Sequence, residues 1–167
     1  MSNALIVYYS RTGTTEALAT ALAERLGADV ARIGCDRYRP GPIRYLRAGW
    51  DSVRGNLPPI DVPPVDTSAY DLVLLGAPIW TSHPALPLRA YLATAPDLPA
   101  RVGLFLTYGG HSPPETAIAE VETLLAGPLA QTLALQNTAV RGAGFADTVD
   151  GFVDKLAING SAPPSRG

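Results

Sequence analysis

Apolar and polar positions along the chain fall into blocks that predict strands and helices in alternation. Short continuous apolar runs are typical of strands buried on both faces, whereas apolar residues three and four positions apart are typical of helices with one buried face. On these criteria the sequence predicts strands over residues 4–9, 29–33, 71–76, 101–107 and 133–140, and helices over 16–26, 43–54 and 86–92, with a fourth helix opened by Pro113-Pro114 and a fifth capped by Asp147.

This alternation predicts an α/β fold, a three-layer sandwich in which a five-stranded parallel sheet has helices on both faces. Right-handed crossovers leave few strand orders, and we expect the order 2-1-3-4-5. In such sheets, ligands bind beyond the carboxyl ends of the strands, where the strand order switches. The loops that follow the first, third and fourth predicted strands should therefore converge on one site.

One domain accounts for nearly the whole chain. Its length of 167 residues and its 47% hydrophobic content are enough for a single core. We predict that residues 1–159 form this domain and that residues 160–167, which include Pro163-Pro164, form a disordered tail. The segment 34–69 is a long, proline-broken connection. Long connections often serve a function, but we favour the simpler interpretation that this one crosses the sheet.

Charge and cysteine content argue against several kinds of site and partner. The net charge is −2, no basic patch points to nucleic acid, and no Lys/Arg run points to an anionic membrane surface. No apolar run approaches the roughly 20 residues that span a bilayer, and the N-terminus lacks the positive region of a signal peptide. Cys35 is the only cysteine, so an intramolecular disulfide is impossible and a cytoplasmic location is expected. No metal-ligand spacing is present.

The loop after the first strand places hydroxyl side chains and a glycine at the start of a helix. Ser10, Thr12 and Thr15, together with backbone N–H groups of that helix, can bind one phosphate. The helix dipole adds partial positive charge, so an anion can be held without a paired lysine. Gly13 allows a tight turn and a close approach to the ligand. The simpler alternative is a polar strand–helix connection with ordinary capping.

Three motifs in the chain resemble those of the flavodoxin family. The first loop, with Ser10, Thr12, Gly13 and Thr15, resembles the loop that binds the FMN phosphate in that family. Residues 76–80, Gly-Ala-Pro-Ile-Trp, resemble its second flavin loop, and residues 107–110, Thr-Tyr-Gly-Gly, resemble its third. With the five matched strands, the resemblance covers about residues 4–158.

The resemblance implies that the chain binds FMN non-covalently. It implies phosphate contacts from the first loop, an aromatic wall from the second, and a further wall with backbone hydrogen bonds from the third. The implied cofactor-binding residues are Ser10, Arg11, Thr12, Gly13, Thr14, Thr15, Pro78, Ile79, Trp80, Thr81, Ser82, Tyr108, Gly109, Gly110 and His111. The resemblance implies no catalytic side chain, because the flavin itself carries the redox chemistry. His83 and His111 are candidate proton donors, although a loop histidine before Pro or Ser is more often a turn residue.

Two departures from the family pattern bear on function. Thr14 stands where most electron-carrying flavodoxins have Asn, and the three loops contain no carboxylate before Glu115, whereas those carriers are strongly acidic around the flavin. Both departures favour an oxidoreductase that passes electrons from NAD(P)H to a quinone or similar acceptor. A flavodoxin-type electron carrier without its own substrate and a cofactor-free binding module stay open as alternatives. The oligomeric state is also open, a homo-oligomer included.

A signalling receiver domain shares this topology but needs different residues. It requires an acidic cluster after the first strand and a phosphoacceptor aspartate after the third. The chain has Tyr8-Tyr9-Ser10 and Ala77-Pro78 at those places, so we set this function aside.

Overall fold

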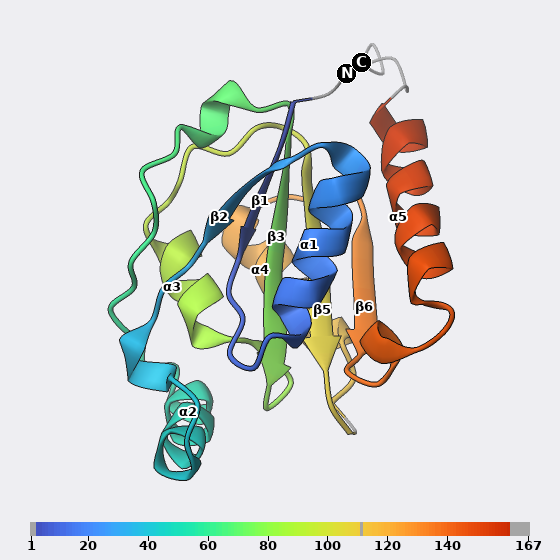
Figure 1. The fold of residues 1–167 in the computed structure, drawn as a ribbon. Coiled ribbons are helices and arrows are strands. Elements are labelled where there is room, and N and C mark those ends of the chain that lie inside the picture. Colours follow the sequence, from blue (N-terminus) through green and yellow to red (C-terminus); the bar gives the residue numbers. More distant parts are fainter. Residues whose placement is uncertain (1–2, 111, 161–167) are drawn as a thin grey trace.

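A computed structural model describes residues 3–110 and 112–160, and its centre is a parallel sheet. The parallel strands are β1 (Ala4–Tyr8), β2 (Asp29–Arg32), β3 (Leu72–Trp80), β5 (Val102–Tyr108) and β6 (Thr132–Gln136). Their order is β2-β1-β3-β5-β6, which is the order predicted from the sequence (Figure 1). A two-residue strand, β4 (His83–Pro84), pairs antiparallel with the end of β3.

Helices cover both faces of the sheet, as the strand–helix alternation predicts (Figure 1). The helices α1 (Thr14–Leu26) and α5 (Phe145–Gly160) pack on one face, and α3 (Leu86–Ala93) and α4 (Glu115–Leu125) pack on the other. Successive residues of β1 point to opposite cores, with Leu5 and Val7 on the α3/α4 side and Ile6 on the α1/α5 side. This alternation explains why the strand is apolar throughout. No helix in the described part of the chain is long and apolar enough to cross a membrane.

Several element boundaries differ from the sequence predictions. The region after Gly76 is not a loop, because β3 continues to Trp80 and then turns into a hairpin with β4. The last strand ends at Gln136, and Val140 lies instead in a 3-10 turn, Ala139–Arg141. Asp147 does not cap α5, which begins two residues earlier and holds Asp147 in its first turn. Gly160 ends α5, and residues 161–167 of the predicted tail lie outside the described residues.

The segment 34–69 does more than cross the sheet, which corrects the simpler interpretation. It contains the helix α2 (Pro42–Arg54), which lies beyond the carboxyl ends of the strands, below the sheet in Figure 1. The predicted bounds of this helix are confirmed to within one residue. Two 3-10 turns, Asp36–Tyr38 and Thr67–Ala69, flank it in the sequence.

A buried carboxylate anchors α2 to the rest of the domain. Asp51 is buried, and its Oδ2 accepts hydrogen bonds from Arg37 Nε at 2.8 Å and from the Tyr38 hydroxyl at 2.9 Å. Its Oδ1 accepts a longer bond from Asn56 at 3.4 Å. The hydrogen bonds from Arg37 hold the pKa of Asp51 below its usual value, against the effect of burial. The ionised carboxylate therefore contributes to stability at neutral pH.

We predict that Asp51→Asn lowers the free energy of unfolding at pH 7 by about 1.5–3 kcal/mol, the usual contribution of hydrogen bonds to a charged group. Because the folded-state pKa is depressed, this contribution is complete above the unfolded pKa of about 3.9 and disappears as the pH falls through the folded value. Urea unfolding followed by circular dichroism at pH 7 and pH 3 measures both quantities. Equal stability of the two proteins at pH 7 would contradict the anchoring role.

A second prediction concerns the close contact of β3 with β5 at Gly76. A Cβ atom at this position would lie 2.0 Å from Cζ of the fully buried Phe105, so we expect Gly76→Ala to destabilise the fold by about 1–3 kcal/mol through overpacking. Gly151, inside α5, has open space where a Cβ would be, and Gly151→Ala should stabilise the protein by about 0.5–1 kcal/mol. Thermal unfolding should show a lower melting temperature for Gly76→Ala and a higher one for Gly151→Ala. A shift in the same direction for both variants would contradict the prediction.

Candidate functional site

A cavity of about 730 Å³ lies at the carboxyl edge of the sheet, a volume typical of small-molecule sites. The loop after β1, the end of β3, the end of β5 and the helix α2 enclose it. Its lining residues are Arg11, Thr12, Thr14, Thr15, Tyr45, Leu46, Ala48, Gly49, Trp50, Val53, Pro78, Ile79, Trp80, Thr81, Thr107, Tyr108, Gly109, Ser112 and Asn137. The segments after the first, third and fourth predicted strands therefore do converge on one cavity.

The loop after β1 has the geometry of an anion cradle. Gly13 adopts a left-handed conformation with φ of 95°, and its N–H donates to Ser10 Oγ at 3.1 Å. The helix α1 begins at Thr14, so the first N–H groups of the helix have no partner inside it. Thr12 and Thr14 line the cavity next to these groups. An anion there would meet hydroxyls, amides and the positive end of the helix dipole together.

Arg11 joins this loop to α2. Its Nη2 donates to the Gly41 carbonyl at 3.3 Å, and its guanidinium lies 5.1 Å from the centre of the Tyr45 ring. Its Nε is buried without a hydrogen-bond partner. Arg11 is also the only charged residue among the described residues that line the cavity. The described lining of the cavity thus contains one cation and no carboxylate.

The other end of the cavity has aromatic walls, with Trp80 on one side. The Trp80 ring packs edge-on against Tyr9 and Tyr38, with ring centres 5.7 and 5.2 Å apart. Burial and the hydrogen bond to Asp51 raise the pKa of Tyr38 to about 12, so its phenol stays neutral. Burial likewise raises the pKa of Tyr9 above its usual value. Trp80 therefore has a fixed, uncharged support and can offer a flat surface to a ligand.

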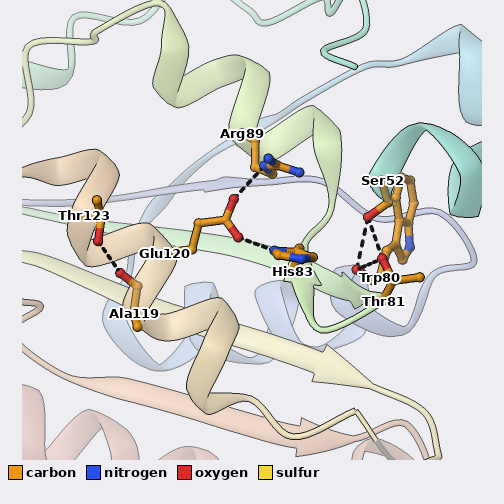
Figure 2. A network of polar contacts seen from close by, with 8 residues as sticks. All are labelled: Ser52, Trp80, Thr81, His83, Arg89, Ala119, Glu120 and Thr123. Atoms are coloured by element: carbon orange, nitrogen blue, oxygen red, sulfur yellow. Dashed lines mark hydrogen bonds and ion pairs between the residues drawn. The ribbon is translucent and has the colours of Figure 1, made fainter. Parts of the chain in front are cut away.

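The turn after Trp80 is held from two sides, as Figure 2 shows. Thr81 and Ser82 both have left-handed backbones, with φ of 48° and 67°, although neither is glycine. On one side the Ser52 hydroxyl of α2 lies 3.1 Å from the Trp80 carbonyl and 2.9 Å from Thr81 Oγ1. The strained turn persists because its surroundings fix it.

On the other side of the turn, His83 is held by a carboxylate. His83 Nδ1 lies 2.5 Å from Glu120 Oε2, and Arg89 Nε lies 2.8 Å from Glu120 Oε1 (Figure 2). His83 is not among the residues that line the cavity, and its ring is paired with Glu120. The structure therefore does not place this candidate proton donor at the cavity. The other candidate, His111, lies outside the described residues.

The end of β5 supplies the remaining wall. Tyr108 and Gly109 line the cavity, and the N–H of Asn137 donates to the Tyr108 carbonyl at 2.8 Å. Just before them, Thr107 Oγ1 lies 2.7 Å from Thr15 Oγ1 in a buried hydroxyl pair. This pair ties the start of α1 to β5, so the cradle and the wall keep a fixed spacing.

The predicted cofactor-binding residues divide into two groups in the structure. Arg11, Thr12, Thr14, Thr15, Pro78, Ile79, Trp80, Thr81, Tyr108 and Gly109 line the cavity, whereas Ser10, Gly13, Ser82 and Gly110 do not. Ser10 and Gly13 shape the cradle through their mutual hydrogen bond. Ser82 occupies the tip of the hairpin, and Gly110 is an exposed left-handed residue after β5.

Sequence reasoning missed the contribution of α2. Tyr45, Leu46, Gly49, Trp50 and Val53 of this helix line the cavity. The available signal was the helical spacing of large apolar residues inside a segment interpreted as a simple connection. In the described part of the chain, no cluster of His, Cys, Asp and Glu could hold a metal ion, and the residues point to an organic ligand with an anionic end.

Comparisons with known proteins identify the fold. No family model matches the sequence, and no curated protein matches it. Solved structures match over nearly the whole chain. A flavoprotein from Lactobacillus acidophilus, crystallised in complex with FMN, is 18% identical with a TM-score of 0.67, covering 92% of this chain and 99% of that one. The oxidised flavodoxin 1 of Bacillus cereus is 16% identical with a TM-score of 0.60, covering 94% and 98%.

A third match is the two-electron-reduced flavodoxin of Megasphaera elsdenii, which is 20% identical with a TM-score of 0.56 and covers 93% of this chain and 98% of that one. These likenesses show that the chain has the flavodoxin-like fold over almost its full length. The fold expected from the three motifs is thereby confirmed.

Proposed function

We propose that this chain binds FMN in the cavity at the carboxyl edge of the sheet and acts as a redox protein. The observation that carries the proposal is the pairing of an anion cradle with aromatic walls in one cavity of suitable size. The flavodoxin-like fold and the FMN complex of the Lactobacillus acidophilus flavoprotein support the choice of ligand. The finer proposal is an oxidoreductase that passes electrons from NAD(P)H to a quinone or similar flat acceptor.

The residues present suit the three parts of FMN. The phosphate needs donors, and Thr12, Thr14 and the first N–H groups of α1 supply them, with the unpartnered Nε of Arg11 nearby. The ring system needs flat apolar walls, which Trp80 and Tyr108 supply. The pyrimidine edge needs backbone groups, which the exposed Gly109 offers.

The protein would contribute orientation and electrostatics, because the bound flavin itself supplies the hydride and electron chemistry. Trp80 and its tyrosine supports would keep water from one side of the ring. The hydroxyl pair of Thr15 and Thr107 would fix the distance between the phosphate cradle and the ring site.

The walls of the cavity favour an uncharged, flat electron acceptor. No carboxylate is among the described lining residues, so the site lacks the negative surround that docks cationic protein partners. On its open side, α2 presents Leu46, Trp50 and Val53, a surface suited to an apolar ring. This wall is the observation that favours an oxidoreductase over a dedicated electron carrier.

We predict that Thr12→Ala weakens FMN binding by roughly 10- to 150-fold, because one hydrogen bond to a charged phosphate contributes about 1.5–3 kcal/mol. Quenching of flavin fluorescence on titration with protein measures the affinity. The control variant Thr20→Ala, at an exposed threonine of α1 outside the cavity lining, should leave the affinity unchanged. If wild-type protein at micromolar concentration leaves flavin fluorescence unquenched, FMN is not the ligand.

We also predict that Val53→Asp raises the KM for an uncharged quinone about tenfold, because it places a charge on the apolar wall. Steady-state assays with NADH and NADPH, using a benzoquinone and cytochrome c as alternative acceptors, measure the change. Val65→Asp alters another exposed valine away from this cavity and serves as the control. Turnover with cytochrome c alone, unaffected by Val53→Asp, would favour the electron-carrier alternative.

A further inference from the structure

The helix α2 leaves its large apolar side chains exposed and does not pack them into the core. Its packed face consists of Ala48, Asp51 and Ser52, which are buried against the domain and hydrogen-bonded or small. On the outer face, Ile43 is 81% exposed and Trp50 is 61% exposed. An ordinary surface helix does the reverse and buries its apolar stripe. The outer face of α2 therefore has the character of a contact surface.

The same helix carries positive charge on an acidic protein. The helix, Pro42–Arg54, holds three of the 13 Lys and Arg residues of the chain and only one of its 15 Asp and Glu residues, the buried Asp51. Arg44, Arg47 and Arg54 are exposed, and none of them forms an ion pair with a described residue. Arg54 instead lies 4.5 Å from the centre of the Trp50 ring. Apolar side chains flanked by arginines are thus gathered on one exposed helix.

A ligand in the cavity does not explain this surface. Leu46 and Val53 lie on the side of α2 that lines the cavity, so a bound ligand would cover part of them. Ile43, Arg44 and Arg47 are not lining residues, and they stay exposed whether or not the cavity is filled. Neither the cavity nor the rest of the described chain covers these three residues.

We propose that the outer face of α2, defined by Ile43, Arg44, Arg47, Trp50 and Arg54, docks on an anionic lipid bilayer. A helix with apolar residues and Trp on one side and arginines beside them matches an interfacial helix, and its positive charge complements anionic headgroups. Ile43 and Trp50 would enter the boundary between headgroups and acyl chains, and the arginines would contact lipid phosphates. The sequence alone gave no sign of this, because the cations are interspersed along the helix rather than consecutive.

Docking in this orientation would place the cavity against the bilayer surface. Trp50 belongs both to the outer face and to the cavity lining, so the two surfaces are continuous. A lipid-soluble acceptor could then reach the cavity without crossing water. This consequence rests on the proposed function, whereas the docking itself does not.

Vesicle sedimentation with the full chain tests the docking. We expect binding to vesicles of phosphatidylcholine mixed with phosphatidylglycerol, little binding to pure phosphatidylcholine, and loss of binding as salt rises from about 0.05 to 0.5 M. Absence of binding to the anionic vesicles, or equal binding to both kinds, would overturn the proposal.

Variants of the outer face separate docking from flavin binding. Arg47→Gln should weaken vesicle binding about fivefold, equivalent to about 1 kcal/mol, and Ile43→Gln about tenfold. Both variants should retain full FMN affinity. A negative result for vesicle binding can therefore be distinguished from a negative result for FMN binding. Matched controls are Ile158→Gln in α5, where the isoleucine is 70% exposed, and Arg141→Gln in the turn after β6.

Two results with these variants would also overturn the proposal. One is that the controls weaken vesicle binding as much as the α2 variants do. The other is that sedimentation velocity shows a dimer which Ile43→Gln dissociates, because a second copy of the chain would then be the partner that covers the outer face.

Discussion

The buried carboxylate of Asp51 is the interaction on which the arrangement of the cavity depends. It accepts hydrogen bonds from Arg37 and Tyr38, and Tyr38 in turn supports the Trp80 ring. The neighbouring Ser52 holds the turn after Trp80. One turn of α2 thereby fixes both the helix and the opposite aromatic wall. A charge removed from water is stable here because its partners are in place.

The sheet and its helices follow from local rules, and those rules predicted them. Apolar runs buried on both faces, separated by helical periodicity, specify a parallel sheet, and crossover handedness then restricts the strand order. The same order places the cradle, Trp80 and Tyr108 at one edge, as expected from the sequence. The hairpin at His83 was not predicted, because its second strand is only two residues long and is defined by its pairing with β3.

The orientation of α2 could not be predicted, since periodicity identifies an apolar face without saying what that face contacts. Ile43, Leu46, Trp50 and Val53 share the spacing of a core-facing stripe, yet all four are exposed. The buried Asp51 and Ser52 on the opposite side decide the orientation through hydrogen bonds with residues 37, 38, 56 and 80. Such long-range polar pairing leaves no periodic trace in the sequence.

The turn at Thr81 and Ser82 is a rigid part of the cavity wall because it is held from two helices. Ser52 fixes it from α2, and the Glu120 carboxylate fixes the adjoining His83 from α4. A wall clamped in this way keeps its dipoles in position when the charge of a neighbouring group changes. In the redox function proposed above, such a wall would contribute little to the reorganisation energy on this side of the cavity.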